Sequence, residues 1–253
     1  MSVLSLKQVS LTIGSNSILR GVDLELQRGE RLALIGPNGA GKSSLFNLIS
    51  GRNSSAGKTR GQILMNEKSI SDLAPYQIAR QGLARSFQVS NVFTHLSVID
   101  NLSCAFMWHL GCRYSFWRRF SRQKQIHVQA ADLLELLGLS AQRDHIAGEL
   151  SYAEQRILEI GMTLACGAHC LLLDEPTAGM SRAETEKTIA LIRTISKGKS
   201  LLMVEHDMQV VFELADRIAV MVHGEIIACD TPEKIRLNAQ VQDAYLGHWE
   251  ATI

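Results

Sequence analysis

Hydrophobic residues along this chain follow a two-residue period in some segments and a helical period in others. Residues 3–26 contain two alternating runs separated by the turn-forming segment 14–17. This pattern predicts an antiparallel β-hairpin. The continuous apolar run 31–35 predicts a buried strand, and a helical pattern begins directly after it at residues 44–49.

The next stretch alternates between breaking residues and short regular elements. Residues 51–61 are polar and glycine-rich, which predicts a loop. Residues 61–66 predict a strand, and residues 74–82 predict a short helix that ends at its glycine. Residues 83–87 then predict a strand that leads to Gln88.

Helical spacing dominates from residue 91 to residue 139, so we expect a separate helical subdomain there. Its clearest helix covers residues 125–137 and is stopped by Gly138. Upstream, residues 112–124 interleave five cationic side chains with four aromatic ones. This segment would suit a nucleic acid or a membrane surface, or it is a solvated insertion whose aromatic rings cover the helical block. The nearly neutral net charge favours the second interpretation.

Strands and helices alternate again near the C-terminal end. The predicted elements are strand 170–173, helix 182–197, strand 200–204, helix 208–214, a hairpin over residues 217–229, and a last helix that starts at Thr231 with a cap and a proline in its first position. Apolar runs of strand length with helices between them are typical of a parallel sheet. The whole pattern predicts an α/β fold with a mainly parallel sheet, an antiparallel β subdomain and an inserted helical subdomain.

Composition narrows the classes of protein that this chain can belong to. The chain has 253 residues, 46% of them hydrophobic, and a formal net charge of +1, so it can bury a large core and gives no general reason to expect a nucleic-acid partner. Its five cysteines form no metal-binding pattern and are expected to be reduced structural thiols of a cytosolic protein. We find neither a secretory signal pattern nor an apolar run of roughly 20 residues. We therefore expect a soluble chain, or one held at a membrane by something else.

One segment carries recognisable chemistry, because it matches the phosphate-binding loop (P-loop) G-x-x-x-x-G-K-[ST] at every fixed position. It consists of Gly36, Pro37, Asn38, Gly39, Ala40, Gly41, Lys42 and Ser43. Glycines let backbone N–H groups approach phosphate oxygens, and the helix N-terminus adds a positive dipole. We expect the loop and Ser44 to bind a nucleoside triphosphate, with Lys42 on the β- and γ-phosphates and Ser43 on magnesium. The complete spacing and both flanks disfavour the alternative, a glycine-rich turn with a solvated lysine.

Acidic and histidine residues follow two of the predicted strands. Asp174 and Glu175 come directly after the run 170–173, and His206 comes shortly after the run 200–204. With a P-loop upstream, we expect Asp174 to hold magnesium through water and Glu175 to act as the general base or to orient the attacking water. We expect His206 to contact the γ-phosphate. The alternatives are a pair of surface carboxylates and a structural histidine.

The order and spacing of these motifs resemble those of ABC-transporter ATP-binding subunits over essentially the whole chain. The segments that carry the resemblance are the P-loop, Gln88, Leu150–Arg156 (LSYAEQR), the strand with Asp174–Glu175, and Glu205–Asp207. The resemblance implies that Gln88 approaches magnesium and relays to a membrane subunit, and that His206 is the switch histidine. It also implies that Gly179–Ser181 is the D-loop of the family.

The same resemblance implies that LSYAEQR is the signature motif of the family. Its residues Ser151, Tyr152, Ala153 and Glu154 would contact the ATP that is bound to a second chain. The active form would then be a head-to-tail dimer with two ATP molecules at the interface.

Three positions depart from the family pattern. Ala153 stands where the signature has a glycine, and we expect its methyl group to tighten or obstruct the approach to the γ-phosphate. Ser181 replaces an acidic or amide residue of the D-loop, which predicts weaker signalling across the dimer. Ile13 occupies the position of an aromatic residue that stacks on adenine, so adenine would pack on an aliphatic face.

The resemblance also implies a division of the chain. We expect one ABC ATPase domain over residues 1–253, with an α/β P-loop NTPase core. Within it, residues 1–88 would be nucleotide-binding core with antiparallel strands, residues 89–157 a helical subdomain with the signature, and residues 158–253 the rest of the core and the C-terminal helix.

Within the family, residues 81–102 and the stretches EHDM and AYLG resemble branched-chain amino-acid importers and the related urea importers. The implied function is an ATP-hydrolysing subunit that drives import of a small polar solute such as a branched-chain amino acid. It would be cytoplasmic and peripheral on the inner face of the cell membrane, with ATP and Mg²⁺ as cofactors. The alternatives are a urea or other amide importer, an ABC ATPase that acts on ribosomes or DNA, and a regulatory ATPase that binds nucleotide without turnover.

The resemblance further implies a set of partners. They are transmembrane permease subunits, a second ATP-binding subunit that is identical or paralogous and, indirectly, a periplasmic or extracellular solute-binding protein. No nucleic acid is expected among them.

Overall fold

The computed structural model of the chain describes residues 1–52, 57–86, 92–109 and 119–245. The strands are β1 (Ser2–Ile13), β2 (Asn16–Gln27), β3 (Arg31–Ile35), β4 (Gly57–Met65), β5 (Lys68–Ser69), β6 (Leu83–Arg85), β7 (Cys170–Asp174), β8 (Ser200–Val204), β9 (Arg217–Val222) and β10 (Glu225–Asp230). The α-helices are α1 (Lys42–Ile49), α2 (Pro75–Arg80), α3 (Val98–His109), α4 (Arg119–Leu136), α5 (Tyr152–Ala165), α6 (Arg182–Ile195), α7 (Met208–Leu214), α8 (Pro232–Leu237) and α9 (Ala239–Tyr245). Short 3₁₀ turns cover Ser140–Gln142 and Ala147–Glu149.

A six-stranded sheet with the order β10–β9–β3–β8–β7–β6 lies at the centre of the fold. The pairs from β9 through β3, β8 and β7 to β6 are parallel, whereas β10 pairs antiparallel with β9. Both faces of this sheet are covered, which explains why its strands are continuous apolar runs. In β3, for example, Leu32 and Leu34 join one hydrophobic core while Ala33 and Ile35 join the other.

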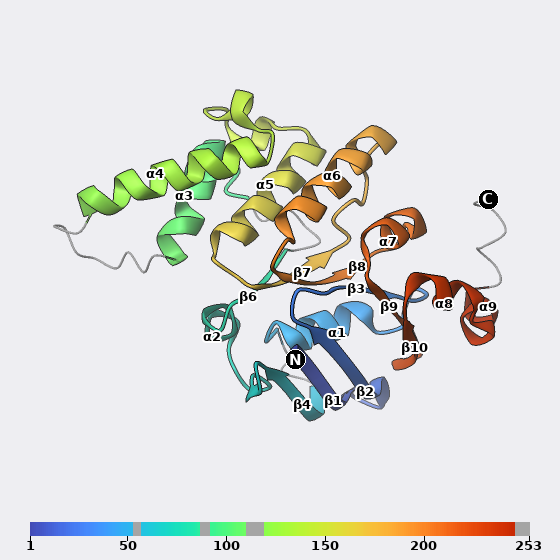
Figure 1. Cartoon of the computed structure of the whole chain (residues 1–253). Helices are drawn as coiled ribbons and strands as arrows, with labels where there is room; N and C mark the ends of the chain where they lie inside the picture. Colours follow the sequence, from blue (N-terminus) through green and yellow to red (C-terminus); the bar gives the residue numbers. More distant parts are fainter. Residues whose placement is uncertain (53–56, 87–91, 110–118, 246–253) are drawn as a thin grey trace.

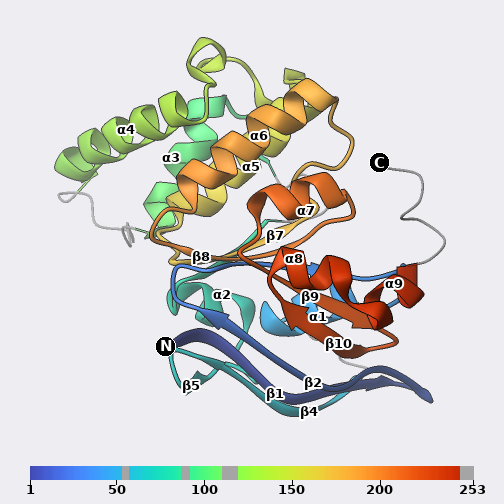
Figure 2. The ribbon, with the colours of Figure 1, turned by 45° about the vertical axis from the view of Figure 1, so that its right-hand side comes forward.

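A second, four-stranded antiparallel sheet with the order β2–β1–β4–β5 lies on one side of the central sheet. Helix α1 lies between the two sheets, as Figure 2 shows. Its Leu45, Phe46 and Ile49 side chains are completely buried there. Strands β1 and β2 pair antiparallel, which confirms the predicted N-terminal hairpin. The sheet that contains them covers helix α1.

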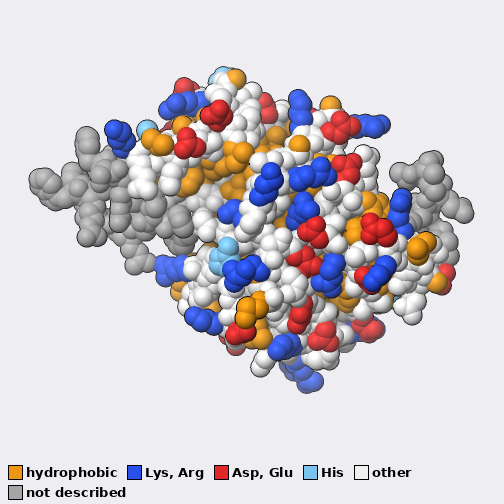
Figure 3. Space-filling model, in the orientation of Figure 1, with side chains coloured by type: hydrophobic (Ala, Val, Ile, Leu, Met, Phe, Trp, Pro, Cys, Tyr) orange, Lys and Arg blue, Asp and Glu red, His pale blue; other side chains and the backbone are white. Residues whose placement is uncertain are grey.

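Helices α5, α6 and α7 lie over the opposite face of the central sheet, and α3 and α4 pack beside α5 (Figures 1 and 2). Helix α3 packs against both α4 and α5, and the buried Leu134 and Leu137 of α4 belong to the same core as Leu158 of α5. This layer contains the predicted helical block. On the described part of the face in Figure 3, basic and acidic side chains are interspersed, in keeping with the small net charge.

Two details here differ from the sequence predictions, and two segments cannot be compared. Strand β4 begins at Gly57, so the second half of the predicted loop 51–61 is a strand. Its polar residues pair with β1, for example Arg60 with Ser10, and main-chain pairing leaves their side chains exposed. Helix α4 starts at Arg119, earlier than predicted. Gln88 and residues 110–118 of the basic aromatic segment lie outside the described residues.

The C-terminal helix is also different, because it is divided into α8 and α9. The Thr231 side chain makes no capping hydrogen bond at the start of α8. Asn238 is extended and ends α8, and its Oδ1 atom accepts a hydrogen bond from the Val241 N–H at 3.2 Å. An asparagine in this position begins a new helix.

The cysteines within the described part of the chain are free thiols, as predicted. They are Cys104, Cys166, Cys170 and Cys229, whereas Cys112 lies outside the described residues. Burial raises the pKa of Cys170 to about 12, so its thiol stays protonated. Among the helices described, none has the length and apolar character that crossing a membrane requires.

Candidate active site

The register of the central sheet brings the predicted motifs to one edge. Val204, the last residue of β8, pairs with Leu34 of β3 on one side and with Asp174 of β7 on the other. The P-loop after β3, Glu175 after β7 and His206 after β8 therefore all follow the carboxyl ends of adjacent parallel strands. This edge is where open α/β sheets bind ligands.

The P-loop is shaped by close approaches that only glycine allows. A Cβ atom on Gly36 would lie 2.1 Å from the carbonyl oxygen of Met221. Gly41 has a φ of 105°, and a Cβ atom there would lie 2.9 Å from Cδ2 of Leu19. Gly41 is also the N-cap of α1, where no side chain caps the helix. The first backbone N–H groups of α1 are thus left for a ligand, and this cradle fits a polyphosphate.

Lys42 is buried and lies over the loop that precedes it. Its Nζ atom donates hydrogen bonds to the carbonyl oxygens of Gly36 at 2.6 Å and Pro37 at 3.0 Å. Burial lowers the pKa of Lys42, while the charges of Glu175 and Asp174 act in the opposite direction. The lysine is therefore within electrostatic reach of the carboxylates after β7. Along the same loop Asn38, Gly39 and Ser43 are exposed, Pro37 and Ser44 are half-buried and Ala40 is buried.

Asp174 is held by an arginine that the sequence analysis did not single out. Its Oδ2 atom accepts a hydrogen bond from Nη2 of Arg85 at 2.8 Å, and the two side chains are 2% and 8% exposed. Nη1 of Arg85 donates to Oδ1 of Asn47 at 2.8 Å and to Oγ of Ser50 at 2.9 Å. Arg85 ends β6, which is parallel to β7, and a charged residue at the end of an apolar strand is the signal that would have identified it.

The residues predicted to hold magnesium form a sparse set. No group of three or more histidine, cysteine or acidic side chains within the described ranges is arranged to hold a metal ion. Mg²⁺ is commonly held by one or two protein ligands together with phosphate oxygens and water. The exposed hydroxyl of Ser43 and the carboxylate of Asp174 fit that description.

Glu175 and His206 lie in direct contact. Nε2 of His206 is 2.8 Å from Oε1 of Glu175, and the side chains are 47% and 20% exposed. Glu175 has a φ of 48°, in the left-handed region that is uncommon for residues other than glycine. Its backbone N–H donates to the Val204 carbonyl at 2.9 Å. The structure thus brings together two of the three predicted catalytic residues, and the third, Gln88, lies outside the described residues.

Glu205 is a buried carboxylate that the sequence analysis assigned no role. Its Oε1 atom accepts hydrogen bonds from the Thr177 N–H at 3.0 Å and the Thr177 hydroxyl at 2.8 Å. Its Oε2 atom accepts from the His206 N–H at 3.1 Å. Burial raises the pKa of Glu205, although these hydrogen bonds act to lower it. Glu205 therefore ties the turn after β7 to the turn that carries His206.

The signature residues form the N-terminus of α5. The Ser151 hydroxyl accepts a hydrogen bond from the Glu154 N–H at 3.3 Å, and Glu154 Oε2 accepts one from the Ser151 N–H at 2.9 Å. This is a reciprocal capping box. Glu154 also accepts a hydrogen bond from Gln142 through its other oxygen at 2.9 Å.

The departures at the signature and at the D-loop have a structural context. Ala153 is 7% exposed, so its side chain packs largely against its own chain. The expected effect of its methyl group on the approach to the γ-phosphate stays a prediction. The neighbouring Tyr152 is exposed, and its ring lies 3.2 Å from the position of a Cβ on Gly179. Ser181 donates to Glu184 Oε2 from its N–H at 2.8 Å and from its hydroxyl at 2.6 Å, which occupies its hydroxyl hydrogen within its own chain.

Ile13, the residue predicted to face adenine, ends β1. It pairs with Asn16 of β2 and Gly57 of β4, and its side chain is 38% exposed. An exposed aliphatic side chain at the end of a hairpin is accessible to a flat ring, so its place in the fold is compatible with the predicted contact.

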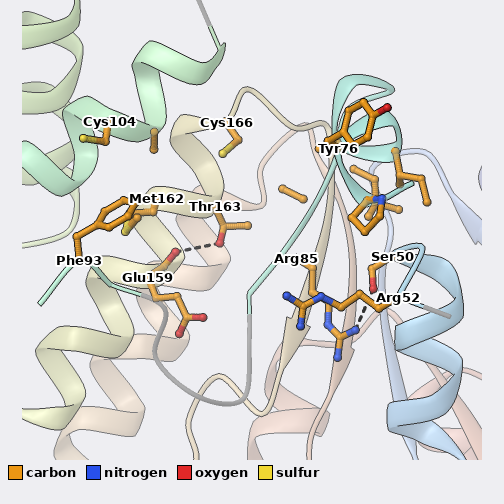
Figure 4. Close-up of a pocket in the computed structure, with 16 residues that line it drawn as sticks. Ser50, Arg52, Tyr76, Arg85, Phe93, Cys104, Glu159, Met162, Thr163 and Cys166 are labelled. Carbon is orange, nitrogen blue, oxygen red and sulfur yellow. Dashed lines mark hydrogen bonds between the residues drawn. The ribbon is translucent and has the colours of Figure 1, made fainter. Parts of the chain in front are cut away.

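A groove of about 520 Å³ is lined by Arg85, the residue that donates a hydrogen bond to Asp174. Its lining comes from α2 and β6 on one side and from α3 and α5 on the other. Figure 4 shows Arg85 and Glu159 on its wall, with the Thr163 hydroxyl donating to the Glu159 carbonyl. The groove thus has charged groups on an otherwise apolar lining.

Known proteins resemble this chain over nearly its whole length. The sequence profile described as ABC transporter matches residues 19–178, and the profile described as branched-chain amino acid ATP-binding cassette transporter matches residues 225–248. The high-affinity branched-chain amino acid transport ATP-binding protein LivG of Escherichia coli K12 is 36% identical, over 97% of this chain and 98% of LivG. BraF of Pseudomonas aeruginosa, which has the same description, is 34% identical over the same shares.

Solved structures agree with the sequence relatives. The crystal structure of the ADP conformation of MJ1267, an ATP-binding cassette of an ABC transporter, has a TM-score of 0.81 and 27% sequence identity. The match covers 98% of this chain and 100% of that cassette. The predicted α/β fold with a P-loop core is confirmed by this similarity.

Proposed function

This chain belongs to the ABC transporter family as an ATP-binding and ATP-hydrolysing subunit, and from that premise we propose that it powers the import of branched-chain amino acids. The substrate class is supported by the curated relatives and by the C-terminal profile over residues 225–248. The structural observation that carries the ATPase chemistry is the Glu175–His206 contact at the same sheet edge as the P-loop.

The residues of this chain have distinct roles in that proposal. The P-loop backbone and Lys42 would bind the phosphates, and Ser43, Asp174 and Gln88 would hold Mg²⁺. When bound, Mg²⁺ neutralises phosphate charge during hydrolysis. Glu175 orients the attacking water and accepts its proton, while His206 fixes the Glu175 carboxylate and reaches the γ-phosphate. Ile13 contributes an aliphatic surface for adenine.

A second ATP-binding subunit would complete each site. Ser151, Tyr152, Ala153 and Glu154 at the start of α5 would contact the nucleotide of the partner, whether that partner is identical or a paralogue. The D-loop, Gly179–Ser181, would lie at the same interface. Because Ser151 and Ser181 begin α5 and α6, both segments have defined backbones before any partner binds.

We further propose that the chain is peripheral on the cytoplasmic face of the cell membrane. Its partners there are transmembrane permease subunits, and a solute-binding protein outside the membrane acts indirectly. In the division into residues 1–88, 89–157 and 158–253, Gln88 ends the first part and would relay to the permease, and the second part carries the signature. Helix α5 crosses the boundary at residue 157 without a break, so the helical part and the core share a rigid element.

Reconstitution tests the proposal directly. The chain would be assembled with its permease subunits in proteoliposomes, and ATP hydrolysis and solute uptake would be measured with a solute-binding protein loaded with leucine or with urea. We expect leucine to stimulate hydrolysis and to be taken up. Stimulation by urea alone would favour the urea importer, and ATP binding without hydrolysis in the full assembly would favour the regulatory module.

A further inference from the structure

A buried arginine on the signature helix has a role that the motifs do not account for. Arg156 belongs to the second turn of α5 and is 1% exposed. Removing a guanidinium from water is costly unless charged and polar partners replace its hydration. The groups that bond to Arg156 therefore indicate the role of its buried guanidinium.

Arg156 joins α5 to the turn that follows β7. Its Nη2 atom donates to the carbonyl oxygen of Asp174 at 2.6 Å and to that of Glu175 at 3.1 Å. Its Nη1 atom donates to Oε2 of Glu159, one helical turn further along α5, at 2.7 Å. The Glu159 side chain is 4% exposed, so the ion pair is buried on both sides. A fixed pair of this kind holds the planar guanidinium in one orientation.

The two carbonyl groups belong to a turn with an uncommon backbone. Glu175 adopts a left-handed φ of 48°, which the surrounding structure must enforce because it is not a glycine. The Val204 carbonyl accepts a hydrogen bond from the Glu175 N–H at 2.9 Å, and Arg156 donates to the carbonyl oxygens of the two peptide groups that flank the Glu175 Cα. Together these bonds fix the direction in which the Glu175 carboxylate leaves the backbone, toward His206.

We propose that Arg156 is a positioning residue for hydrolysis, which holds the Asp174–Glu175 turn so that the Glu175 carboxylate stays in contact with His206. The inference rests on the proposed ATPase function and extends it to a residue outside the signature contacts. Because Arg156 and the signature residues lie on one continuous helix, a shift of α5 is transmitted to the catalytic turn. Glu159, which also lines the groove, is the anchor of the arginine.

The test compares Arg156→Lys with a matched control, Arg31→Lys. Lysine keeps the positive charge beside Glu159 but lacks the planar fork that reaches two carbonyl groups and a carboxylate together. Arg31 forms a bidentate ion pair with Asp216 at the start of β3, the end of this strand that is away from the P-loop. Its replacement therefore removes a bidentate guanidinium contact that is remote from the site. We expect kcat of Arg156→Lys to fall on the order of tenfold to a hundredfold while the Kd for ATP stays within about threefold. The control should keep both values.

A second background separates positioning from a general effect on stability. In a Glu175→Gln chain, Arg156→Lys should lower the residual hydrolysis no further, because it acts through Glu175. An unchanged kcat in the wild-type background, or an equal fractional loss in both backgrounds, would overturn the proposal. A wild-type chain that does not hydrolyse ATP would instead refute the proposed function itself.

If Arg156→Lys does not fold, Glu159→Gln provides the decisive variant. Glutamine keeps an oxygen acceptor for Arg156 but removes the charge that fixes the guanidinium. A fall in kcat with retained ATP binding would support the proposal, and wild-type kcat in this folded variant would overturn it.

Discussion

The Nε2 atom of His206 lies 2.8 Å from the Oε1 atom of Glu175. The two residues follow adjacent parallel strands, β8 and β7, and each is fixed by its backbone as well as by this contact. The His206 N–H is held by Glu205, and the Glu175 N–H is held by Val204. A carboxylate and an imidazole that are oriented in this way can act on one water molecule as a unit.

Glu175→Gln should abolish most hydrolysis while ATP still binds. The amide keeps the size of the side chain but cannot accept a proton, and loss of a general base typically costs about 10²- to 10⁴-fold in rate. Single-turnover hydrolysis and binding of a fluorescent ATP analogue would be measured on the same preparation. Retention of more than half the wild-type rate would remove Glu175 from the mechanism.

His206→Ala should lower hydrolysis in the wild-type background and have little further effect in the Glu175→Gln background. This non-additivity is expected because the residues are in contact and act together. All four combinations would be assayed for kcat, and His223→Ala is a matched control because that histidine lies in the β9–β10 turn. Independent, multiplicative losses would show that His206 acts without Glu175.

Glu175 and His206 could be placed from the sequence because buried parallel strands are recognisable as apolar runs. Residues 170–173 and 201–204 are continuous apolar runs, and polar groups at their carboxyl ends must lie at one edge of the sheet. Arg85 also ends an apolar strand, which places it at the same edge of the sheet, but its partner could not be predicted from the sequence. Its partner Asp174 is 89 residues away, and the local hydrophobic pattern does not predict contacts between residues so far apart in the sequence.

Ala153 shows a second limit of sequence reasoning. A motif comparison identifies a missing glycine but does not give the direction of the added methyl group. The helical phase of α5, set by the capping box of Ser151 and Glu154 and by packing on the core, turns this residue inward. Strand β4 is a similar case, because its polar first half is specified by pairing with β1 instead of by its own hydrophobicity.

Arg85→Lys should raise the Mg²⁺ concentration needed for half-maximal hydrolysis. Lysine cannot bond Asp174, Asn47 and Ser50 together, so the carboxylate would be held less firmly, and loss of such an outer partner costs on the order of tenfold in metal affinity. Binding of Mn²⁺ to the ATP complex, measured by electron paramagnetic resonance, gives a second readout. Arg193→Lys, on the exposed face of α6, is the control. An unchanged Mg²⁺ requirement would show that Arg85 is only structural.

Glu205→Gln should change how stability depends on pH. Burial raises the pKa of Glu205 above its ordinary value of 4.5, so the folded state holds this proton more tightly than the unfolded state. The resulting stabilisation is complete below pH 4.5 and is lost as the pH rises through the higher folded pKa. Chemical denaturation at several pH values should therefore show wild-type stability falling relative to Glu205→Gln over that interval. A constant difference from pH 4 upward would contradict the shift.

Ala153→Gly, which restores the glycine of the family signature, should weaken the fold without accelerating hydrolysis. The Ala153 methyl group is buried, so its removal leaves the surface that faces a partner unchanged and takes apolar contact from the core. Glycine near the start of a helix also costs backbone entropy, and we expect the free energy of unfolding to fall by about 1 kcal/mol. Denaturant titration and ATPase assays of the assembled transporter would test both parts. Ala190→Gly, on the exposed face of α6, is a control for the helix effect alone. A higher kcat with unchanged stability would mean that the methyl group obstructs the signature after all.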